Sequence, residues 1–334
     1  MKTIRRFLET LASSKRSAGI LCVLSLAALA GSELAARQQQ QNGLAHNGLA
    51  SPEIEILLHA DSPQVFASGI ISTGKEFGAT FMPDGREVYF TRYDTEKKVN
   101  HIYRSLLLSG NWQPATPLEF STATYSDLDA ELSPDGRRLF FVSTRPKPGT
   151  SVDGVKKDMD IWVVDRRGDQ WNEPQWVENV NSVGKEGSPS VARDGTLYFF
   201  SDRDAAPNTN SIYVSKFVGA KYASPLKLPS PVSSTSSDTS PFVSSDGKTL
   251  LFYSTRPGGY GGADLYVSYA SHKRWAQPIN LGAVVNTENW EYNPSVSPDG
   301  QLLYFGRNRQ IYVLPLKDVG LRSLNPERFR SQVS

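Results

Sequence analysis

Five Asp-Gly pairs recur along this chain of 334 residues at an almost constant spacing of 51 to 59 residues. They are Asp84-Gly85, Asp135-Gly136, Asp194-Gly195, Asp246-Gly247 and Asp299-Gly300. An acidic residue lies eight positions before the Asp of every pair: Glu76, Asp127, Glu186, Asp238 and Glu291. Self-similarity with a period near fifty residues is typical of repeat architectures. The chain is therefore predicted to contain five copies of one structural unit.

Each Asp-Gly pair separates two short apolar runs, which is the pattern of a β-hairpin because the glycine supplies the positive φ of a tight turn. The second run is apolar at successive positions, as in Leu139-Phe140-Phe141 and Leu303-Tyr304-Phe305. A strand with one solvated face would alternate between apolar and polar residues. These strands are therefore expected to be covered on both faces, as in the stacked sheets of a β-propeller.

A third strand is marked in every repeat by an aliphatic residue followed by an aromatic one: Ile102-Tyr103, Ile161-Trp162, Ile212-Tyr213, Leu265-Tyr266 and Ile311-Tyr312. A fourth strand is predicted to begin at an aromatic residue three positions before a proline, as in Trp171 with Pro174 and Trp275 with Pro278. Proline is tolerated at the edge of a sheet, so this strand should be the outermost one. Four strands in about fifty residues match one propeller blade.

The ends of the repeat region decide the number of blades. The fifth repeat lacks a fourth strand after Tyr312, whereas Pro63 to Phe66 resembles an outer strand with no blade of its own. We expect this N-terminal strand to pair with the last blade and close a ring of five four-stranded blades, because an open sheet edge invites aggregation. Six blades are the alternative if residues 50–62 or the C-terminal tail form an irregular blade. The propeller is expected to span residues 61–318, followed by a tail over 319–334.

The first thirty residues are predicted to be a secretory signal peptide. Five Lys and Arg residues precede an apolar segment from about Ala18 to Ala30, which ends in Ala28-Leu29-Ala30. An uncleaved anchor is the alternative and the one route to the membrane, although the segment is shorter than the roughly 20 apolar residues of a membrane span. Residues 31–60 are expected to be a flexible leader. The protein should accordingly be periplasmic or secreted.

Composition excludes some classes of partner. The net charge is +2, and without the basic first thirty residues it falls to about −2. No basic cluster accompanies exposed aromatic residues, so nucleic-acid binding is not expected. The single cysteine, Cys22, lies in the predicted signal peptide, so the rest of the chain tolerates an oxidising compartment without a disulfide.

The repeat resembles the Pro-Asp type of WD40-like β-propeller repeat found in TolB proteins. Pro83-Asp84-Gly85, Pro134-Asp135-Gly136 and Pro298-Asp299-Gly300 match its turn, and Asp160-Ile161-Trp162 and Asp264-Leu265-Tyr266 match its third strand. The resemblance covers about residues 63–315. It implies an exported scaffold, a carbohydrate-active enzyme or a non-catalytic cap, and a periplasmic role in envelope integrity. TolB itself has six blades after a separate N-terminal domain, and this chain shows neither.

The five repeated acids are the first candidates for a binding site. An arginine follows the second strand of each repeat: Arg92, Arg145, Arg203, Arg256 and Arg307. The loop before strand one and the loop after strand two emerge on the same side of a blade, so acids and arginines should share one rim. They are expected either to form ion pairs that hold the blades, or to bind a cation or a polyol at the channel mouth. Calcium suits such oxygen-rich sites, but no spacing matches a calcium loop, so neither a metal nor a cofactor is expected.

Asp160 and Asp264 are the candidates for catalysis. They open third strands on the same side as the acids, and two carboxylates beside a cleft can act as acid and base on a glycosidic bond. The repeat explains their presence without such a role. No Gly-x-Ser-x-Gly motif and no histidine pair with metal-ligand spacing accompanies them.

Irregular loops are the better guide to a binding surface, because blade cores obey packing while loops vary. The second repeat inserts residues 146–159, and the fourth inserts Pro257-Gly-Gly-Tyr260-Gly-Gly, both between strands two and three. Tyr260 is predicted to stack on a sugar or a peptide ring, unless this segment is only a flexible connection. The preferred function is therefore an exported, non-catalytic propeller that binds a protein or an envelope glycan on this face. The alternative is a glycoside hydrolase or polysaccharide lyase that uses the rim carboxylates.

Overall fold

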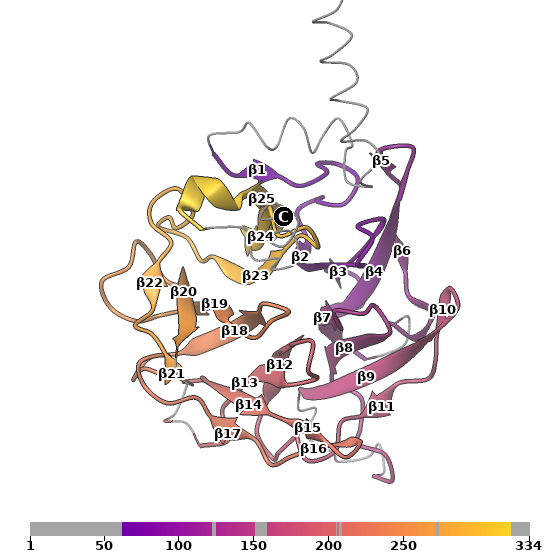
Figure 1. Cartoon of the computed structure of the whole chain (residues 1–334). Coiled ribbons are helices and arrows are strands. Elements are labelled where there is room, and N and C mark those ends of the chain that lie inside the picture. Colours follow the sequence, from indigo (N-terminus) through magenta and orange to yellow (C-terminus); the bar gives the residue numbers. More distant parts are fainter. Residues whose placement is uncertain are drawn as a thin grey trace, which may run out of the picture. The chain divides into compact units, whose positions relative to one another are not determined.

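The computed structural model describes residues 62–121, 125–150, 159–204, 206, 209–271 and 274–321. In this part of the chain, five antiparallel sheets stand side by side around a central axis (Figure 1). The protein is therefore an all-β propeller with five blades, as predicted, and not with six. The predicted signal peptide, the leader and the tail beyond Leu321 lie outside the described residues.

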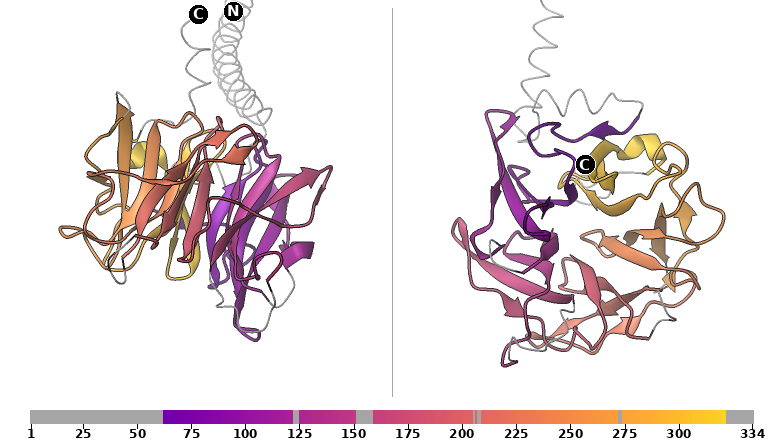
Figure 2. Two further views of the ribbon diagram at one scale, coloured as in Figure 1. Left: turned by 90° about the horizontal axis from the view of Figure 1, so that it is seen from below. Right: turned by 180° about the vertical axis from the view of Figure 1, so that it is seen from behind.

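In every blade, the first three strands of the repeat lie next to one another in chain order, with the first nearest the axis (Figure 2). The inner strands are β2 (Glu76–Phe81), β7 (Asp127–Leu132), β12 (Glu186–Val191), β18 (Asp238–Val243) and β23 (Tyr292–Val296). The second strands are β3 (Glu87–Asp94), β8 (Arg138–Ser143), β13 (Leu197–Ser201), β19 (Thr249–Ser254) and β24 (Leu302–Arg307). The third strands are β4 (Val99–Leu108), β9 (Asp160–Arg167), β14 (Ser211–Ser215), β20 (Asp264–Ser271) and β25 (Gln310–Pro315).

The outer strand differs from the prediction, because a proline divides it into two short pieces. The aromatic residue lies in the first piece, which is β5 (Asn111–Trp112), β10 (Gln170–Trp171), β16 (Lys221–Tyr222) or β21 (Arg274–Trp275). The second piece follows the proline and pairs with the third strand; it is β6 (Thr116–Pro117), β11 (Gln175–Trp176), β17 (Leu226–Lys227) or β22 (Ile279–Asn280). In the third blade, β16 pairs with β15 (Phe217–Val218) instead of β14. Proline has no N–H to donate, so it interrupts the ladder where it occurs.

Each inner strand contains a β-bulge at the same position, two residues after the repeated acid. The register shifts there in all five inner pairs. The residues with positive φ at these bulges are Gly78, Asp129, Ser188, Ser240 and Asn293. A bulge adds one residue to a strand and redirects its side chains, so these five residues face the axis of the propeller.

The apolar core consists of clusters that lie between neighbouring sheets. Leu139, Phe140, Phe141 and Val142 of β8 are all fully buried, because the first sheet covers one face of this strand and the third covers the other. The same holds around the ring, with one cluster between each pair of adjacent sheets. The prediction that these strands are covered on both faces is confirmed.

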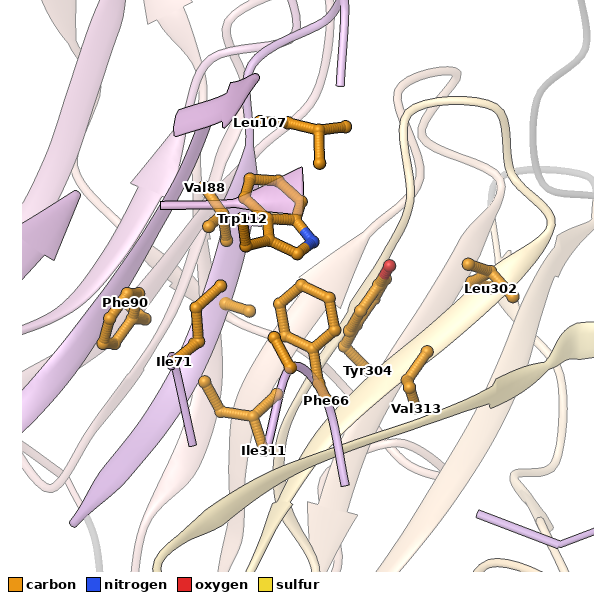
Figure 3. Close-up of a cluster of buried hydrophobic side chains, with 12 residues drawn as sticks. Phe66, Ile71, Val88, Phe90, Leu107, Trp112, Leu302, Tyr304, Ile311 and Val313 are labelled. Carbon is orange, nitrogen blue, oxygen red and sulfur yellow. The ribbon is translucent and has the colours of Figure 1, made fainter. Parts of the chain in front are cut away.

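The fifth blade receives its outer strand from the other end of the described chain. The short strand β1 (Gln64–Val65) pairs antiparallel with Val313 and Tyr312 of β25. Phe66 follows β1 and is 2% exposed, packed between Trp112 of the first sheet and Tyr304 of the fifth (Figure 3). Its ring centre lies 5.6 Å from that of Trp112 and 5.0 Å from that of Tyr304. The cluster between the first and last sheets therefore includes residues from three separate parts of the chain.

We predict that Phe66→Ala lowers the free energy of unfolding by about 3 to 5 kcal/mol, because it leaves a cavity where these two sheets meet. Urea denaturation followed by tryptophan fluorescence measures the loss. Val183→Ala is the matched control, since Val183 is 91% exposed and should change stability by less than about 0.5 kcal/mol. A loss below about 1 kcal/mol for Phe66→Ala would show that the packing of the first blade against the fifth does not depend on this contact.

Candidate functional site

Every blade carries an ion pair between the repeated acid and the arginine at or near the end of the second strand. The pairs are Glu76–Arg92 at 2.6 Å, Asp127–Arg145 at 3.0 Å, Glu186–Arg203 at 2.9 Å, Asp238–Arg256 at 2.7 Å and Glu291–Arg307 at 2.8 Å. The acidic side chains are at most 1% exposed. We call each pair a clamp. The clamps and the loops between second and third strands lie on the same face of the propeller, which we call the loop face.

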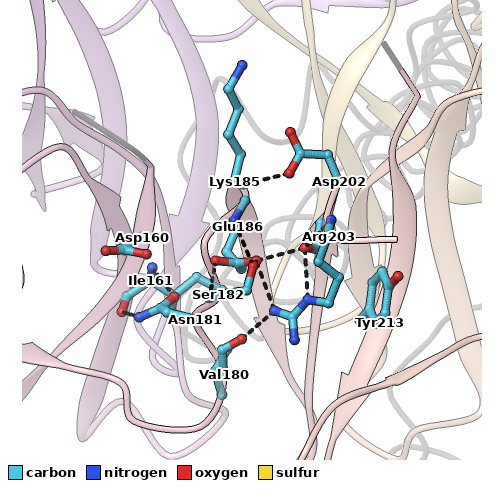
Figure 4. A network of polar contacts seen from close by, with 12 residues as sticks. Asp160, Ile161, Val180, Asn181, Ser182, Lys185, Glu186, Asp202, Arg203 and Tyr213 are labelled. Atoms are coloured by element: carbon cyan, nitrogen blue, oxygen red, sulfur yellow. Dashed lines mark hydrogen bonds and ion pairs between the residues drawn. The ribbon is translucent and has the colours of Figure 1, made fainter. Parts of the chain in front are cut away.

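The clamp of the third blade shows how such a buried carboxylate is satisfied (Figure 4). Glu186 accepts hydrogen bonds from the backbone N–H of Ser182 at 2.8 Å and from the hydroxyl groups of Ser182 and Ser201 at 2.6 and 2.7 Å. Arg203 also donates to the carbonyl oxygen of Val180, which belongs to the segment arriving from the second blade. A buried charge is tolerated when it is paired and fully hydrogen-bonded in this way.

The guanidinium groups of the clamps also lie over aromatic rings of the second and third strands. Arg203 is 5.5 Å from the ring centre of Phe199 and 5.1 Å from that of Tyr213. The corresponding ring pairs are Phe90 and Tyr103, Phe141 and Trp162, Phe252 and Tyr266, and Phe305 and Tyr312. Cation–π contacts of this kind are favourable. The acids and arginines that we predicted as ligand-binding residues are thus bound to one another, and a ligand would have to displace one partner.

The structure does not bring Asp160 and Asp264 together, because they open third strands in the second and fourth blades. Asp264 is 1% exposed and accepts hydrogen bonds from the backbone N–H groups of Tyr260 and Gly261 at 2.7 and 3.2 Å. Asn280 donates to the same carboxylate at 2.7 Å. Asp160 accepts a hydrogen bond from the Trp176 indole at 3.1 Å. The contacts of Asp264 therefore fix the loop that carries Tyr260.

Two exposed aromatic residues lie on segments of the loop face that touch each other. Tyr260 is 53% exposed and Trp290 is 54% exposed. The loop of Tyr260 packs tightly against the segment before β23, since a Cβ atom on Gly262 would lie 2.1 Å from the indole nitrogen of Trp290. Ala263 and Trp290 also form a β-bridge. The glycines thus allow the two segments to touch, and we call Tyr260 and Trp290 the aromatic pair.

A second polar centre lies on the axis, at the level of the bulges. Asp129 accepts hydrogen bonds from the hydroxyl of Ser188 in the third blade at 2.7 Å and from the amide of Asn293 in the fifth at 3.0 Å. The hydroxyl groups of Ser188 and Ser240 are 3.0 Å apart. This network connects four blades, and the cavity at its level measures only about 30 Å³. The channel is therefore almost closed there, and burial raises the pKa of Asp129.

A larger cavity of about 270 Å³ lies beyond this constriction, toward the Asp-Gly turns. We call it the turn-face cavity, and Glu131 lines both it and the constriction. The Glu131 carboxylate is 3.5 Å from the hydroxyl of Ser190. Burial raises the pKa of Glu131 to about 8, and hydrogen bonds with Thr80 and Ser190 oppose this only in part. No ion pair involves Asp129 or Glu131 within the described residues.

Our reading of the sequence missed Trp290, Asp129 and Glu131, although each departs from the repeat. The residue before the acid is Lys75, Ser126, Lys185 or Ser237 in the other blades, and only the fifth has tryptophan. The residues two and four positions after the acid are neutral in four repeats and acidic in the second alone. A comparison of equivalent positions would have found all three residues.

Neither a metal centre nor a membrane-spanning helix is found in the described part of the chain. No group of three or more His, Cys, Asp or Glu side chains among the described residues could hold a metal ion. Within the same residues, no helix is long and apolar enough to cross a membrane.

No protein-family model and no curated protein sequence matches the chain. Among solved structures it is similar to TolB from Acinetobacter baumannii, at 19% identity and a TM-score of 0.42, over 71% of this chain and 53% of that one. A gluconolactonase from Xanthomonas campestris is similar at 13% identity and a TM-score of 0.43, over 77% of this chain and 96% of its own. Hydrazine synthase from Kuenenia stuttgartiensis is similar at 12% identity and a TM-score of 0.48, over 73% of this chain and 38% of that one. These likenesses concern the fold alone, and the assignment to the TolB-type repeat family stays a prediction.

We predict that Arg203→Ala lowers the free energy of unfolding by about 3 to 5 kcal/mol, because it leaves the Glu186 carboxylate buried without its cation. Denaturant unfolding measures the effect. Arg86→Ala is the control, since this arginine is exposed and should change stability by less than about 0.5 kcal/mol. The double variant Glu186→Gln, Arg203→Met should lose less stability than Arg203→Ala alone, because it leaves no buried charge without a partner. Equal stability of Arg203→Ala and the wild type would contradict a structural role for the clamp.

The raised pKa of Glu131 predicts a specific dependence of stability on pH. Below about pH 4.5 the carboxyl is protonated in both states, whereas between pH 4.5 and 8 the unfolded chain loses the proton and the folded protein keeps it. The wild type should therefore become less stable relative to Glu131→Gln as the pH rises through this window, by on the order of 3 to 5 kcal/mol. Chemical denaturation of both proteins from pH 4 to 9 measures the difference. Parallel stability curves would contradict the assignment.

Proposed function

We propose that this protein is an exported, non-catalytic β-propeller whose loop face binds an envelope glycan. The single observation that carries the proposal is the aromatic pair, two large side chains that stay more than half exposed on two segments packed against each other. An exposed aromatic surface with fixed geometry is typical of a binding site, because apolar rings contribute contact area at a low cost in conformational entropy. The flat faces of pyranose rings present C–H groups that complement such a surface.

The support beneath Tyr260 favours recognition over flexibility. Asp264 holds the backbone at Tyr260 and Gly261, and Trp290 packs against the neighbouring glycine. A side chain on a rigid support loses less entropy on binding than one on a mobile loop. The contacts of Asp264 therefore prepare the loop for a ligand, which is a better account of this buried carboxylate than proton transfer.

Catalysis is the weaker proposal, because the carboxylates that would perform it are engaged elsewhere. A glycosidase needs two carboxyl groups about 5 to 10 Å apart on either side of the scissile bond. Asp160 and Asp264 lie in non-adjacent blades, and the five clamp acids are buried against their arginines. A scaffold that binds without turnover agrees with these contacts.

The test is a binding screen of the exported protein against peptidoglycan fragments and bacterial and plant polysaccharides, followed by calorimetry on the ligands retained. Tyr260→Ala and Trp290→Ala should each weaken binding by roughly tenfold, about 1.4 kcal/mol, because each removes half of the aromatic pair. Tyr269→Ala is the matched control, since Tyr269 is an exposed aromatic residue at the opposite end of β20. It should bind as the wild type does.

Three results would overturn the proposal. Turnover of a glycan that Asp264→Asn abolishes would show an enzyme. Equal glycan binding by the wild type and both aromatic variants would place recognition elsewhere. Retention of no glycan, together with a defined protein ligand lost in Tyr260→Ala and Trp290→Ala, would assign this face to a protein partner instead.

A further inference from the structure

The turn-face cavity lies on the opposite side of the axial constriction from the aromatic pair, and the function proposed above does not use it. All five blades line it, through residues that include Thr80, Glu131, Val191, Phe242 and Ser295. Its volume of about 270 Å³ is near the lower limit of small-molecule sites, which begin at roughly 300 Å³. The cavity therefore has room for a ligand of a few carbon atoms and not for an oligosaccharide chain.

Among the described residues that line this cavity, Glu131 is the one carboxylate and Arg193 is the one cation. Its hydrogen-bonding neighbours are the neutral hydroxyl groups of Thr80 and Ser190, and no charged group acts on it. Asp129 precedes it by two residues on β7 and faces the same axis, again without an ion pair among the described residues. Every clamp acid in this protein has an arginine. Arg193 belongs to the same wall but does not act on Glu131, and neither axial acid has an ion pair within the described residues, so a positively charged ligand would complement Glu131.

The remaining wall decides what kind of cation would fit. Phe81, Val191 and Phe242 present apolar surface to the cavity, and aromatic faces attract organic cations. A hard metal ion would need several oxygen ligands around it. No described group of three or more acidic, histidine or cysteine side chains could hold one. An ammonium group with a short carbon chain satisfies both the carboxylate and the apolar wall.

We propose that the turn-face cavity binds a small organic ammonium ion, with its charge on the Glu131 carboxylate and its carbon chain against Phe81, Val191 and Phe242. Ammonium N–H groups donate to the carboxylate oxygens. The hydroxyl groups of Thr80 and Ser295 lie at the same wall, where Thr80 accepts from the Leu132 N–H and Ser295 donates to the Ala79 carbonyl. Because the folded protein keeps Glu131 protonated near neutral pH, binding at pH 7 releases the carboxyl proton to the solvent. The proposal is independent of the glycan site, since the two lie on opposite faces.

The test is isothermal titration calorimetry of the purified protein with n-butylammonium chloride, with 1-butanol as the neutral probe of the same length. We expect saturable binding of butylammonium at one site, stronger by several-fold for each pH unit between pH 6 and 8, and no saturable binding of 1-butanol. Titration at pH 7 in two buffers with different ionisation enthalpies should show release of close to one proton. Glu131→Gln should bind at least tenfold more weakly at pH 8.5 and lose the pH dependence.

Asp84→Asn is the matched control, because Asp84 is an exposed carboxylate of an Asp-Gly turn on the same face. Asp84→Asn should bind butylammonium as the wild type does. If the cation were only attracted by the overall charge of this face, Asp84→Asn would bind it more weakly. Unfolding curves of Glu131→Gln confirm that the variant is folded. The proposal is overturned if 1-butanol binds as well as butylammonium, if Glu131→Gln binds like the wild type, or if neither probe gives saturable binding at pH 8.5.

Discussion

The ion pair of the partly buried arginine in each clamp is the interaction on which the rest of this propeller depends. It joins three parts of the structure: the carboxylate at the start of the inner strand, the rings of the second and third strands, and a carbonyl of the segment that arrives from the preceding outer strand. In the first blade that segment follows β1, and Arg92 donates to the carbonyl oxygen of Ile71. The N-terminal segment thus has the same contact that connects successive blades elsewhere, as with Val180 in the third blade.

Such a pair is not an obvious source of stability, because the desolvation of two charges offsets most of their attraction. Its stronger effect is on geometry. A bidentate or stacked guanidinium group accepts few orientations, so five clamps fix the ends of the strands at one face of the molecule. Loops that begin beyond a fixed end are free to vary without disturbing the core. The glycine-rich loop of Tyr260 departs from the repeat in this way, and it recruits Asp264 as a further anchor.

Repetition explains why so much of the fold could be predicted from the sequence. The Asp-Gly turns, the doubly covered strands and the number of blades follow from features that recur five times, so a chance match at one position has little weight. The outer strands were harder to predict, since a proline divides each of them and pairing at an edge leaves a weak pattern. The acids and arginines, expected near one another, form five ion pairs. The sequence left open whether they form ion pairs or bind a ligand, because that choice depends on side-chain packing that spacing does not encode.

The least predictable feature is the axial channel, because its lining depends on the bulges. A positive φ at Asp129 turns this side chain toward the axis, where an unbulged strand would direct it differently. Five equivalent bulges make a ring, but a symmetric ring of small polar residues would offer a ligand no preferred side. The second blade removes that symmetry with two acids on one strand, while Ser188 and Asn293 close the channel around the first of them. The closure separates two faces with different chemistry, with the exposed Tyr260 and Trp290 on one side and the cavity of Glu131 and Arg193 on the other. A protein that held one ligand along its whole axis would not need this division, and the two sites that we propose lie on either side of it.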